Sequence, residues 1–358
     1  MRYVPTFCIR EGMVLGKSLY GSNNELMLRD GTELTANYIR LITKLQYNGL
    51  YVQDSLSENI EIANMIDENV KNEAIKGIKK IFMSPGKDTK NFENRVKEIN
   101  AIVTDIIEGI LKNKDLMLNM IDLKVFDDYT FYHSTNVAIL SLLIGVTLNL
   151  PKHTLYELCL SAFLHDIGKV FIPKEVLNKE GKLTDKEYDV MKGHTELGSK
   201  YVMKAFSIPE RVCDGIIDHH EKFDGTGYPN KKKGHKISLF GRIIAVADVY
   251  DALTSDRVYR KGLPPSEAME FIMGGAGLQF DPEIVQIFVK KVAPYPLGTC
   301  VELSNGMIGI VIANYEDCCL RPSVKVFQHN GVDVTPFVMN LKSDLQYTNV
   351  TILKIAEI

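Results

Sequence analysis

Seven candidate ligands, five of them histidines and two aspartates, lie between residues 133 and 248 of this 358-residue sequence, most of them at or inside apolar segments. They are His133, His165, Asp166, His194, His219, His220 and Asp248. Imidazole and carboxylate together are typical ligands of Fe, Mn and Zn, and the absence of cysteine disfavours a structural zinc site. Each residue alone has an ordinary explanation, such as a hydrogen-bonded histidine at a helix end. Their joint pattern predicts a metal centre.

The dipeptide His165-Asp166 offers two adjacent ligands of different type. The aspartate could bridge two cations while the histidine holds one of them, which suits a site that activates a bridging water near neutral pH. Lys169 follows Asp166 by one helical turn and is expected to point to the same place. A solvated lysine near a helix C-terminus would have the same spacing, so that interpretation of Lys169 stays open.

The remaining candidate ligand and the other histidines differ in their surroundings. Asp248 lies in the segment AVADVYDAL of an apolar helix expected at residues 241–253, where a carboxylate without a cation or a donor is costly. By contrast, His153, His235 and His329 lie in polar, loop-like segments. We expect these three histidines to be solvated.

The composition is that of a globular protein of two or three domains, with 45% hydrophobic residues and a net charge of −3. The lack of a basic excess argues against DNA or RNA as a partner. Six cysteines without finger or framework spacing, and no apolar signal segment, predict a reducing, cytoplasmic setting. The apolar run at residues 137–150 is shorter than the ~20 residues of a membrane span. We expect a buried helix there and no membrane span.

Short apolar runs separated by turn signals predict a small β-rich module at the N-terminus. Strands are expected at residues 13–15, 26–28 and 50–52, with one helix at 35–47. A second small β module is expected at the C-terminus, with a hairpin around Asn305-Gly306 and a further strand at residues 324–327.

The region between these modules has helical periodicity, so the fold class is mainly α. Thr184 and Glu187 form a capping box that is expected to open the helix carrying His194. Another helix, at residues 93–111, places one apolar stripe on one face. This stripe predicts either packing within its own domain or a homodimer through residues 93–111, and its spacing does not separate the two. Its residues are Val96, Ile99, Ile102, Val103, Ile106, Ile107 and Ile110.

Five separated segments resemble, in order, the motifs of the HD-GYP family, a group of the HD metal-dependent phosphohydrolases. They are HSTNVA (133–138), HDIGK (165–169), LTDKEYDVMKGHTELG (183–198), HHEKFDGTGYP (219–229) and ADVYDALTSDRVYR (247–260). The resemblance covers about residues 126–293, less than half of the chain. It implies an all-helical HD-type domain whose metal centre hydrolyses cyclic di-GMP to pGpG and, in some members, on to GMP.

The resemblance also divides the candidate ligands into two sets. His133, His165, Asp166 and Asp248 would hold one metal, and Asp166, His194, His219 and His220 the other, with Asp166 bridging. The implied substrate-binding residues are Lys169 at the scissile phosphate, Arg257 and Arg260 at phosphate oxygens, and Gly227, Tyr228 and Pro229 at the rim. Asp166 and Lys169 would be the catalytic pair. Fe or Mn is the expected metal.

Two departures from the family pattern bear on these expectations. Members with a third metal carry a glutamate four residues before the first histidine, where this chain has Tyr129. A phenol with a pKa near 10 is a poor replacement, so we expect two metals, although Asp127 and Asp128 could compensate. The second departure is the run of lysines at residues 231–233. We expect a solvated loop there, the alternative being a positive field that attracts an anionic substrate.

The leading prediction is a cyclic di-GMP phosphodiesterase. The alternatives are a phosphodiesterase for another cyclic dinucleotide, such as cyclic GMP-AMP, and a silent sensor that binds the nucleotide without hydrolysing it. Four parts are predicted: a β-rich module at 1–58, a helical linker at 59–125, the catalytic domain at 126–293 and a small antiparallel module at 294–358.

Overall fold

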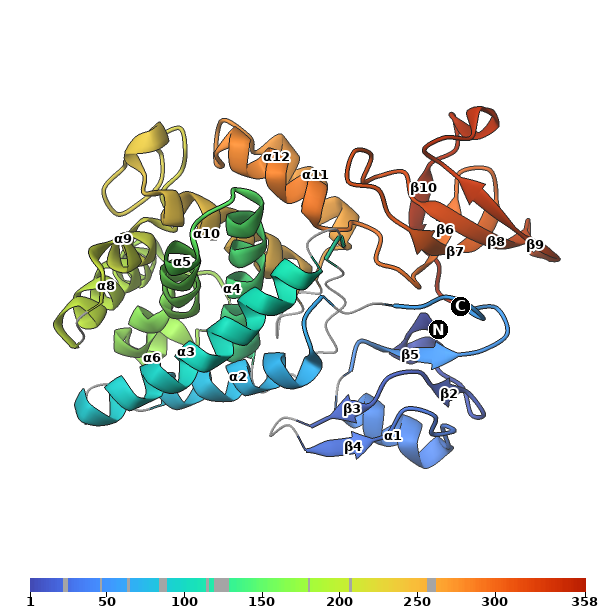
Figure 1. Ribbon diagram of the computed structural model, residues 1–358, viewed down its shortest axis with the longest axis horizontal. Helices are drawn as coiled ribbons and strands as arrows, with labels where there is room; N and C mark the ends of the chain where they lie inside the picture. Colours follow the sequence, from blue (N-terminus) through green and yellow to red (C-terminus); the bar gives the residue numbers. More distant parts are fainter. Residues whose placement is uncertain are drawn as a thin grey trace.

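A computed structural model gives the structure of the protein, which is mainly α with small sheets toward both termini (Figure 1). It describes residues 1–21, 25–45, 47–62, 65–83, 89–113, 116–118, 129–179, 181–205, 208–255 and 262–358, and their side chains except at 68, 89–99 and 129. The helices other than α1 (Ala36–Lys44) gather on one side of the molecule, and the two β modules lie next to each other on the opposite side, with α1 in the N-terminal one.

The N-terminal module contains the predicted strands and two that the sequence pattern did not indicate. β1 (Arg2–Pro5), β5 (Gly49–Gln53) and β2 (Val14–Leu15) form an antiparallel sheet in the order β1-β5-β2. β3 (Leu19–Tyr20) pairs with β4 (Leu26–Leu28). The predicted helix is α1 (Ala36–Lys44). Thr35 is its N-cap, and the Thr35 side chain accepts a hydrogen bond from the Tyr38 amide.

Two helices, α2 (Glu68–Phe82) and α3 (Thr89–Lys112), pack on each other and against the central helix α4 (Tyr129–Thr147). The C-terminal half of the α3 stripe is buried in the main core of this chain, at Val103, Ile106, Ile107 and Ile110. These four side chains therefore pack within their own chain, which is the first of the two interpretations of the stripe. A homodimer through residues 93–111 stays a prediction.

Helices that are apolar on all sides form the centre of the helical region, as expected for buried helices. α4 packs on α5 (Lys152–Leu164) and α10 (Leu239–Thr254), and α9 (Glu210–Asp218) packs on α5, α10 and α8 (His194–Ala205). The predicted buried helix at residues 137–150 is confirmed by the burial of α4 from Val137 to Ile144. Among the described residues, no helix is long and apolar enough to cross a membrane.

Shorter elements complete the helical region. They are η3 (Ile167–Phe171), α6 (Lys174–Leu177), α7 (Asp185–Lys192), η4 (Gly234–Lys236), α11 (Pro265–Gly274) and α12 (Pro282–Lys291). The predicted capping box is present, since the Thr184 hydroxyl accepts from the Glu187 amide and the Glu187 carboxylate from the Thr184 amide. However, the helix it opens ends at Lys192. His194 instead begins α8, because Gly193 ends α7 one residue earlier, which corrects that prediction.

The C-terminal module is a five-stranded antiparallel sheet in the order β10-β6-β7-β8-β9. The predicted hairpin joins β6 (Cys300–Leu303) to β7 (Met307–Ala313), and Gly306 takes the positive φ of 78° that its turn requires. β8 (Ser323–His329) confirms the predicted strand at 324–327 and is followed by β9 (Val332–Asn340) and β10 (Ile352–Ile355).

The buried guanidinium of Arg2 joins the N-terminal and C-terminal modules. Its Nε donates to Asp54 Oδ2 at 2.7 Å, and its Nη1 donates to the Ile358 carbonyl at 2.8 Å. The side chain is only 8% exposed, so these charge-assisted bonds replace its hydration. Leu56 of the N-terminal module also packs against a hydrophobic cluster that includes Phe327 of the C-terminal module. The division of the chain at 58, 125 and 293 stays a prediction, and α2 and α3 share the main core with α4.

Candidate metal centre

The predicted ligands come together from five elements of the helical region. His133 lies in α4, His165 and Asp166 at the end of α5, His194 at the start of α8, His219 and His220 after α9, and Asp248 in α10. Their ligand atoms form three overlapping groups, each within 4.8 Å: His194 with His219 and His220, His133 with His165 and Asp166, and His165 with His219 and Asp248. All seven side chains except that of His220 are buried.

The two oxygens of Asp166 face different histidines. Oδ2 lies 3.4 Å from His165 Nε2 and 3.8 Å from His133 Nε2. Oδ1 lies 3.5 Å from His194 Nε2. Asp248 closes the first side, with its Oδ1 3.1 Å from His133 Nε2. A carboxylate placed between two sets of imidazoles can serve both, as a bridging ligand does.

Backbone carbonyls orient three of the imidazoles. Nδ1 of His165, His194 and His219 each lies 2.7 Å from the carbonyl oxygen three residues earlier. A carbonyl can only accept, so Nδ1 carries the proton and the Nε2 lone pair is free for a cation. Burial lowers the pKa of His194 and His219, so both rings are neutral at pH 7.

Two observations test whether this cluster fits metal ions, and both favour it. Nε2 of His194 and His219 lie 3.4 Å apart although neither carries a proton, and such facing lone pairs need a cation between them. Nε2 of His165 is buried and has no hydrogen-bond partner among the described residues. The cluster therefore has the donor set and the unsatisfied atoms of a site for divalent metal ions.

The charges of the cluster point the same way. Asp166 and Asp248 are buried carboxylates. Burial raises the pKa of Asp166, but Lys169, His165 and His194 together hold it well below its ordinary value. Burial also raises the pKa of Asp248. The hydrogen bond with His133 has the opposite effect, and the pKa of Asp248 lies below its ordinary value. Buried ionised carboxylates require nearby positive charge, which metal ions would supply.

Gly168 allows the two halves of the cluster to approach. A Cβ at this position would lie 1.9 Å from the His194 carbonyl oxygen and 2.6 Å from the Gly198 amide nitrogen. The turn after Asp166 therefore packs directly on the backbone of α8, which brings His194 to Asp166. Close backbone approach is a role that only glycine can fill.

Asp251 orients His133 and was not among the predicted site residues. Its Oδ2 accepts from His133 Nδ1 at 2.7 Å, and its Oδ1 accepts from Asn136 Nδ2 at 2.8 Å. Burial lowers the pKa of His133, but the hydrogen bonds with Asp248 and Asp251 raise it to about 9. The signal in the sequence is the position of Asp251, three residues after Asp248 on the same apolar helix.

We expect Asp251→Asn to lower the affinity of the cluster for Mn²⁺ by about 10- to 100-fold, because the amide lacks the charge and has one acceptor oxygen for the two donors of His133 and Asn136. The affinity is measured by competition with a chromophoric chelator. Asp224→Asn is the matched control, since Asp224 is a loop carboxylate that bonds only Thr226 among the described residues. An unchanged affinity in Asp251→Asn would refute this role.

Two carboxylates flank the histidine pair and fix the loop that follows it. Asp218 is fully buried, and Glu221 is 3% exposed. Glu221 accepts from the amides of Asn230 at 2.7 Å and Lys232 at 3.1 Å. Lys232 Nζ lies 2.8 and 2.9 Å from the two Asp218 oxygens. In the stretch from 218 to 221, the inner two side chains enter the cluster and the outer two hold the loop.

The predicted solvated lysine run is therefore wrong for one of its three members. Lys231 and Lys233 are exposed, whereas Lys232 is partly buried in its ion pair with Asp218. The physical reason is that Asp218 lies at the buried end of α9 and needs a cation. The histidines expected to be solvated, His153, His235 and His329, are all exposed.

We expect Lys232→Met to lower the free energy of unfolding by about 1–3 kcal/mol, because it leaves the buried Asp218 carboxylate without its ammonium partner. Urea unfolding measures the change. Lys231→Met, which removes an exposed lysine next to it, should change the stability by less than ~0.5 kcal/mol. Adding Asp218→Asn to Lys232→Met should recover part of the loss, and purely additive effects would contradict the proposed pairing.

The loop residues 227–229 lie beside the cluster. A Cβ on Gly227 would lie 2.2 Å from the Lys222 amide nitrogen, so the loop packs against the backbone just after the histidine pair. The Tyr228 ring lies over His220, with 4.9 Å between ring centroids and 34° between planes. The bond from Tyr228 to Pro229 is cis. The Tyr228 ring thus contacts His220, and its place at the rim of a substrate pocket stays a prediction.

The structure also locates the predicted catalytic lysine. Lys169 Nζ lies 2.5 Å from Asp166 Oδ2, and the side chain is 34% exposed, so it reaches the open side of the cluster. Arg257 and Arg260, predicted to bind phosphate, lie outside the described residues, as do Asp127 and Asp128. The Tyr129 side chain also lies outside the described part, although its backbone begins α4.

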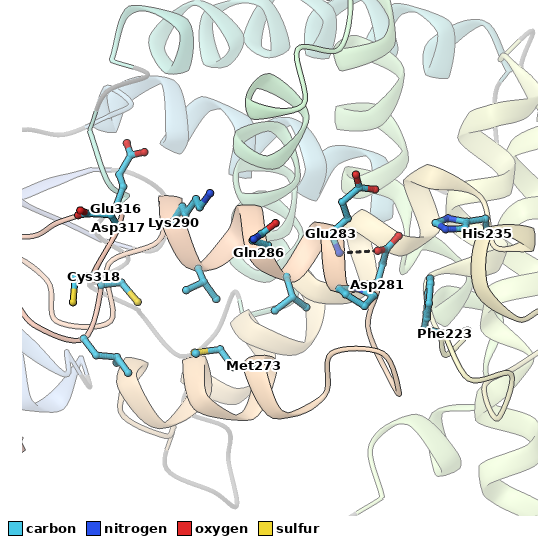
Figure 2. Close-up of a pocket in the computed structure, with 15 residues that line it drawn as sticks. Phe223, His235, Met273, Asp281, Glu283, Gln286, Lys290, Glu316, Asp317 and Cys318 are labelled. Atoms are coloured by element: carbon cyan, nitrogen blue, oxygen red, sulfur yellow. Dashed lines mark hydrogen bonds between the residues drawn. The ribbon is translucent and has the colours of Figure 1, made fainter.

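A separate cavity of about 910 Å³ lies between α12 and the segment 316–320 of the C-terminal module (Figure 2). Its lining includes Phe223, His235, Met273 and Cys318. It shares no lining residue with the histidine and aspartate cluster. The candidate active site is therefore the histidine and aspartate cluster, and this cavity lies apart from it.

Comparison with known proteins finds a family match over the region that contains the cluster. Residues 115–284 match the HD domain family. A cyclic di-GMP phosphodiesterase of Pseudomonas aeruginosa is 36% identical over 273 residues, which are 76% of this chain and 64% of the relative. A cyclic di-GMP phosphodiesterase of Vibrio cholerae is 46% identical over 139 residues, 36% of this chain and 27% of that protein.

A relative with a different named substrate also matches. The 3'3'-cGAMP-specific phosphodiesterase 1 of Vibrio cholerae is 35% identical over 190 residues, 53% of this chain and 43% of its own length. The chain spans less than two thirds of the length of each of these curated relatives.

Proposed function

We propose that this chain is a metal-dependent phosphodiesterase that hydrolyses cyclic di-GMP. Its residues 115–284 match the HD domain family, and five of its segments resemble the motifs of the HD-GYP group. The observation that carries the proposal is the placement of Asp166 between two sets of imidazoles. The relatives named cyclic di-GMP phosphodiesterases support the substrate. The product would be pGpG, GMP or both.

We further propose that the cluster holds two divalent metals, Fe or Mn, with Asp166 between them. His133, His165 and Asp248 would complete one site, and His194, His219 and His220 the other. The imidazole and carboxylate donors support these metals, because such sites accept Fe and Mn. When bound, the metals would supply Lewis acidity and a nucleophilic water at neutral pH. Two rather than three metals are proposed because Tyr129 stands where a third site would need a carboxylate.

The side chains of the chain itself would bind and orient the substrate. Lys169 Nζ, on the open side of Asp166, is placed to donate to a phosphate oxygen and to offset charge that develops there. The hydrogen bonds from Nδ1 hold three imidazoles in one tautomer, so no ring has to reorient during the reaction. Gly227 and Tyr228 would form the wall of the substrate pocket, and Arg257 and Arg260 would bind further phosphate oxygens.

Cyclic GMP-AMP is the second candidate substrate. A relative that is 35% identical is named as specific for 3'3'-cGAMP, and the proposed metal and phosphate contacts do not read bases. Turnover of the two dinucleotides by the same preparation separates the candidates. A higher kcat/KM for 3'3'-cGAMP would replace cyclic di-GMP in the proposal.

The test of the proposed function is hydrolysis of cyclic di-GMP by anaerobically purified protein, with the metal content determined on the same sample. We expect turnover with about two metals per chain. About three metals with turnover would retain the enzyme and refute the argument from Tyr129. Binding of the nucleotide without turnover, even after Fe²⁺ or Mn²⁺ is supplied, would replace the enzyme by a sensor.

A further inference from the structure

An aromatic side chain with no role in the core lies near the cluster, in contact with Tyr228. Tyr188 is 49% exposed on α7, and none of the eight residues of that helix is buried. An exposed tyrosine ring offers a ligand a large amphipathic surface, with an apolar face and a polar hydroxyl. The position of Tyr188 therefore calls for a ligand rather than a packing role.

Ring contacts connect Tyr188 to the cluster. The Tyr188 ring meets the Tyr228 ring edge-on, with 6.4 Å between centroids and 79° between planes. Tyr228 in turn lies over His220 at 4.9 Å. His220 itself packs on His194 and His219, with centroids 5.1 and 4.0 Å away. A row of rings thus leads from the buried histidines to the solvent, and Tyr188 is its outermost member.

The helix that carries Tyr188 is held firmly although it contributes no buried residue. The capping box of Thr184 and Glu187 fixes its first turn, and Lys179 Nζ binds the same Glu187 carboxylate at 2.6 Å. Lys192, paired with Asp189 at 2.6 Å, places its ammonium 5.1 Å from the Tyr188 ring centroid. The ring is therefore pre-positioned, with a cation over one of its faces, which favours a flat and electron-rich or anionic ligand.

We propose that Tyr188 is a specificity-determining residue that stacks on a nucleobase of the cyclic dinucleotide while its phosphates occupy the cluster. This inference rests on the proposed function. A phosphodiester without bases would not reach Tyr188. A nucleotide base beside the cluster meets an aromatic face of the kind that binds bases through stacking.

The test compares Tyr188→Ala, Tyr188→Phe and the wild type on cyclic di-GMP. We expect Tyr188→Ala to raise KM about tenfold or more, a change of about 1.4 kcal/mol, with kcat within about twofold. Tyr188→Phe should keep the wild-type KM because it retains the ring. Inhibition by inorganic phosphate, which has no base, should be the same in all three. Val190→Ala, which removes an exposed side chain of the same helix, is the control.

The outcomes separate this inference from the proposed function. If the wild type does not turn over the dinucleotide, the proposed function fails, and the Kd of the metal-loaded protein for cyclic di-GMP then tests the stacking alone. An unchanged KM or Kd in Tyr188→Ala would overturn the stacking. So would a KM in Tyr188→Phe as high as in Tyr188→Ala, or a parallel weakening of phosphate inhibition, since these indicate a structural defect.

Discussion

Asp166→Asn is expected to lower kcat/KM for cyclic di-GMP by about 10³-fold or more and to lower the metal content of the purified protein. The two oxygens of this carboxylate face separate sets of imidazoles, at 3.4 Å from His165 Nε2 and 3.5 Å from His194 Nε2. An amide keeps the shape but loses the charge and one oxygen ligand. The loss of several kcal/mol of metal-dependent stabilisation corresponds to this factor, at 1.36 kcal/mol for each tenfold change.

Steady-state kinetics and metal analysis on the same sample measure both effects. Asp317→Asn is the control, because Asp317 is an exposed carboxylate of the C-terminal module that pairs with Lys342. That variant should keep its activity and its metals. Wild-type turnover in Asp166→Asn would falsify the bridging role and, with it, the proposed mechanism.

Lys169→Met is expected to lower kcat by about 10²- to 10³-fold while leaving the metal content unchanged. The ammonium lies 2.5 Å from Asp166 Oδ2 on the open side of the cluster, and it is the charged donor proposed to face the phosphate. Loss of one preorganised donor at a site of developing charge has an effect of this size. The contrast with Asp166→Asn, which loses metal as well, separates catalysis from metal binding.

Lys174→Met removes a lysine from the exposed side of the nearby helix α6 and is the matched control. Its kcat should be that of the wild type. If Lys169→Met also loses its metals, Lys169 acts by holding Asp166 in place and does not contact the substrate. Full turnover in Lys169→Met would remove this residue from the mechanism.

The sequence alone predicted the elements whose signals are local. α4 and α10 were predictable because they are apolar on all sides, and the hairpin at Asn305-Gly306 because its turn needs a positive φ. The chemistry of the site was predictable for a similar reason. Imidazole and carboxylate are ligand types wherever they lie, and their motifs follow one another in the order of the HD-GYP family.

Some errors arose where a local signal has two outcomes. Thr184 and Glu187 correctly marked a helix start, but the turn at Gly193 ends that helix before His194. The apolar stripe of α3 predicted a buried face without saying what covers it, and part of it is covered by this chain's own core. The lysine run looked like a solvated loop, although Lys232 pairs with a buried carboxylate 14 residues earlier.

By itself, the sequence determined which side chains could bind metal and which segments are buried helices, because both follow from residue type and from spacing within one element. Only the tertiary structure decided that Asp166 presents one oxygen to each set of imidazoles, that Asp251 orients His133 from 118 positions away and that Tyr188 lies beside Tyr228. These contacts depend on how helices cross and on close approaches such as that of Gly168 to His194. Periodicity fixes the face of a helix but not the neighbour that this face will meet.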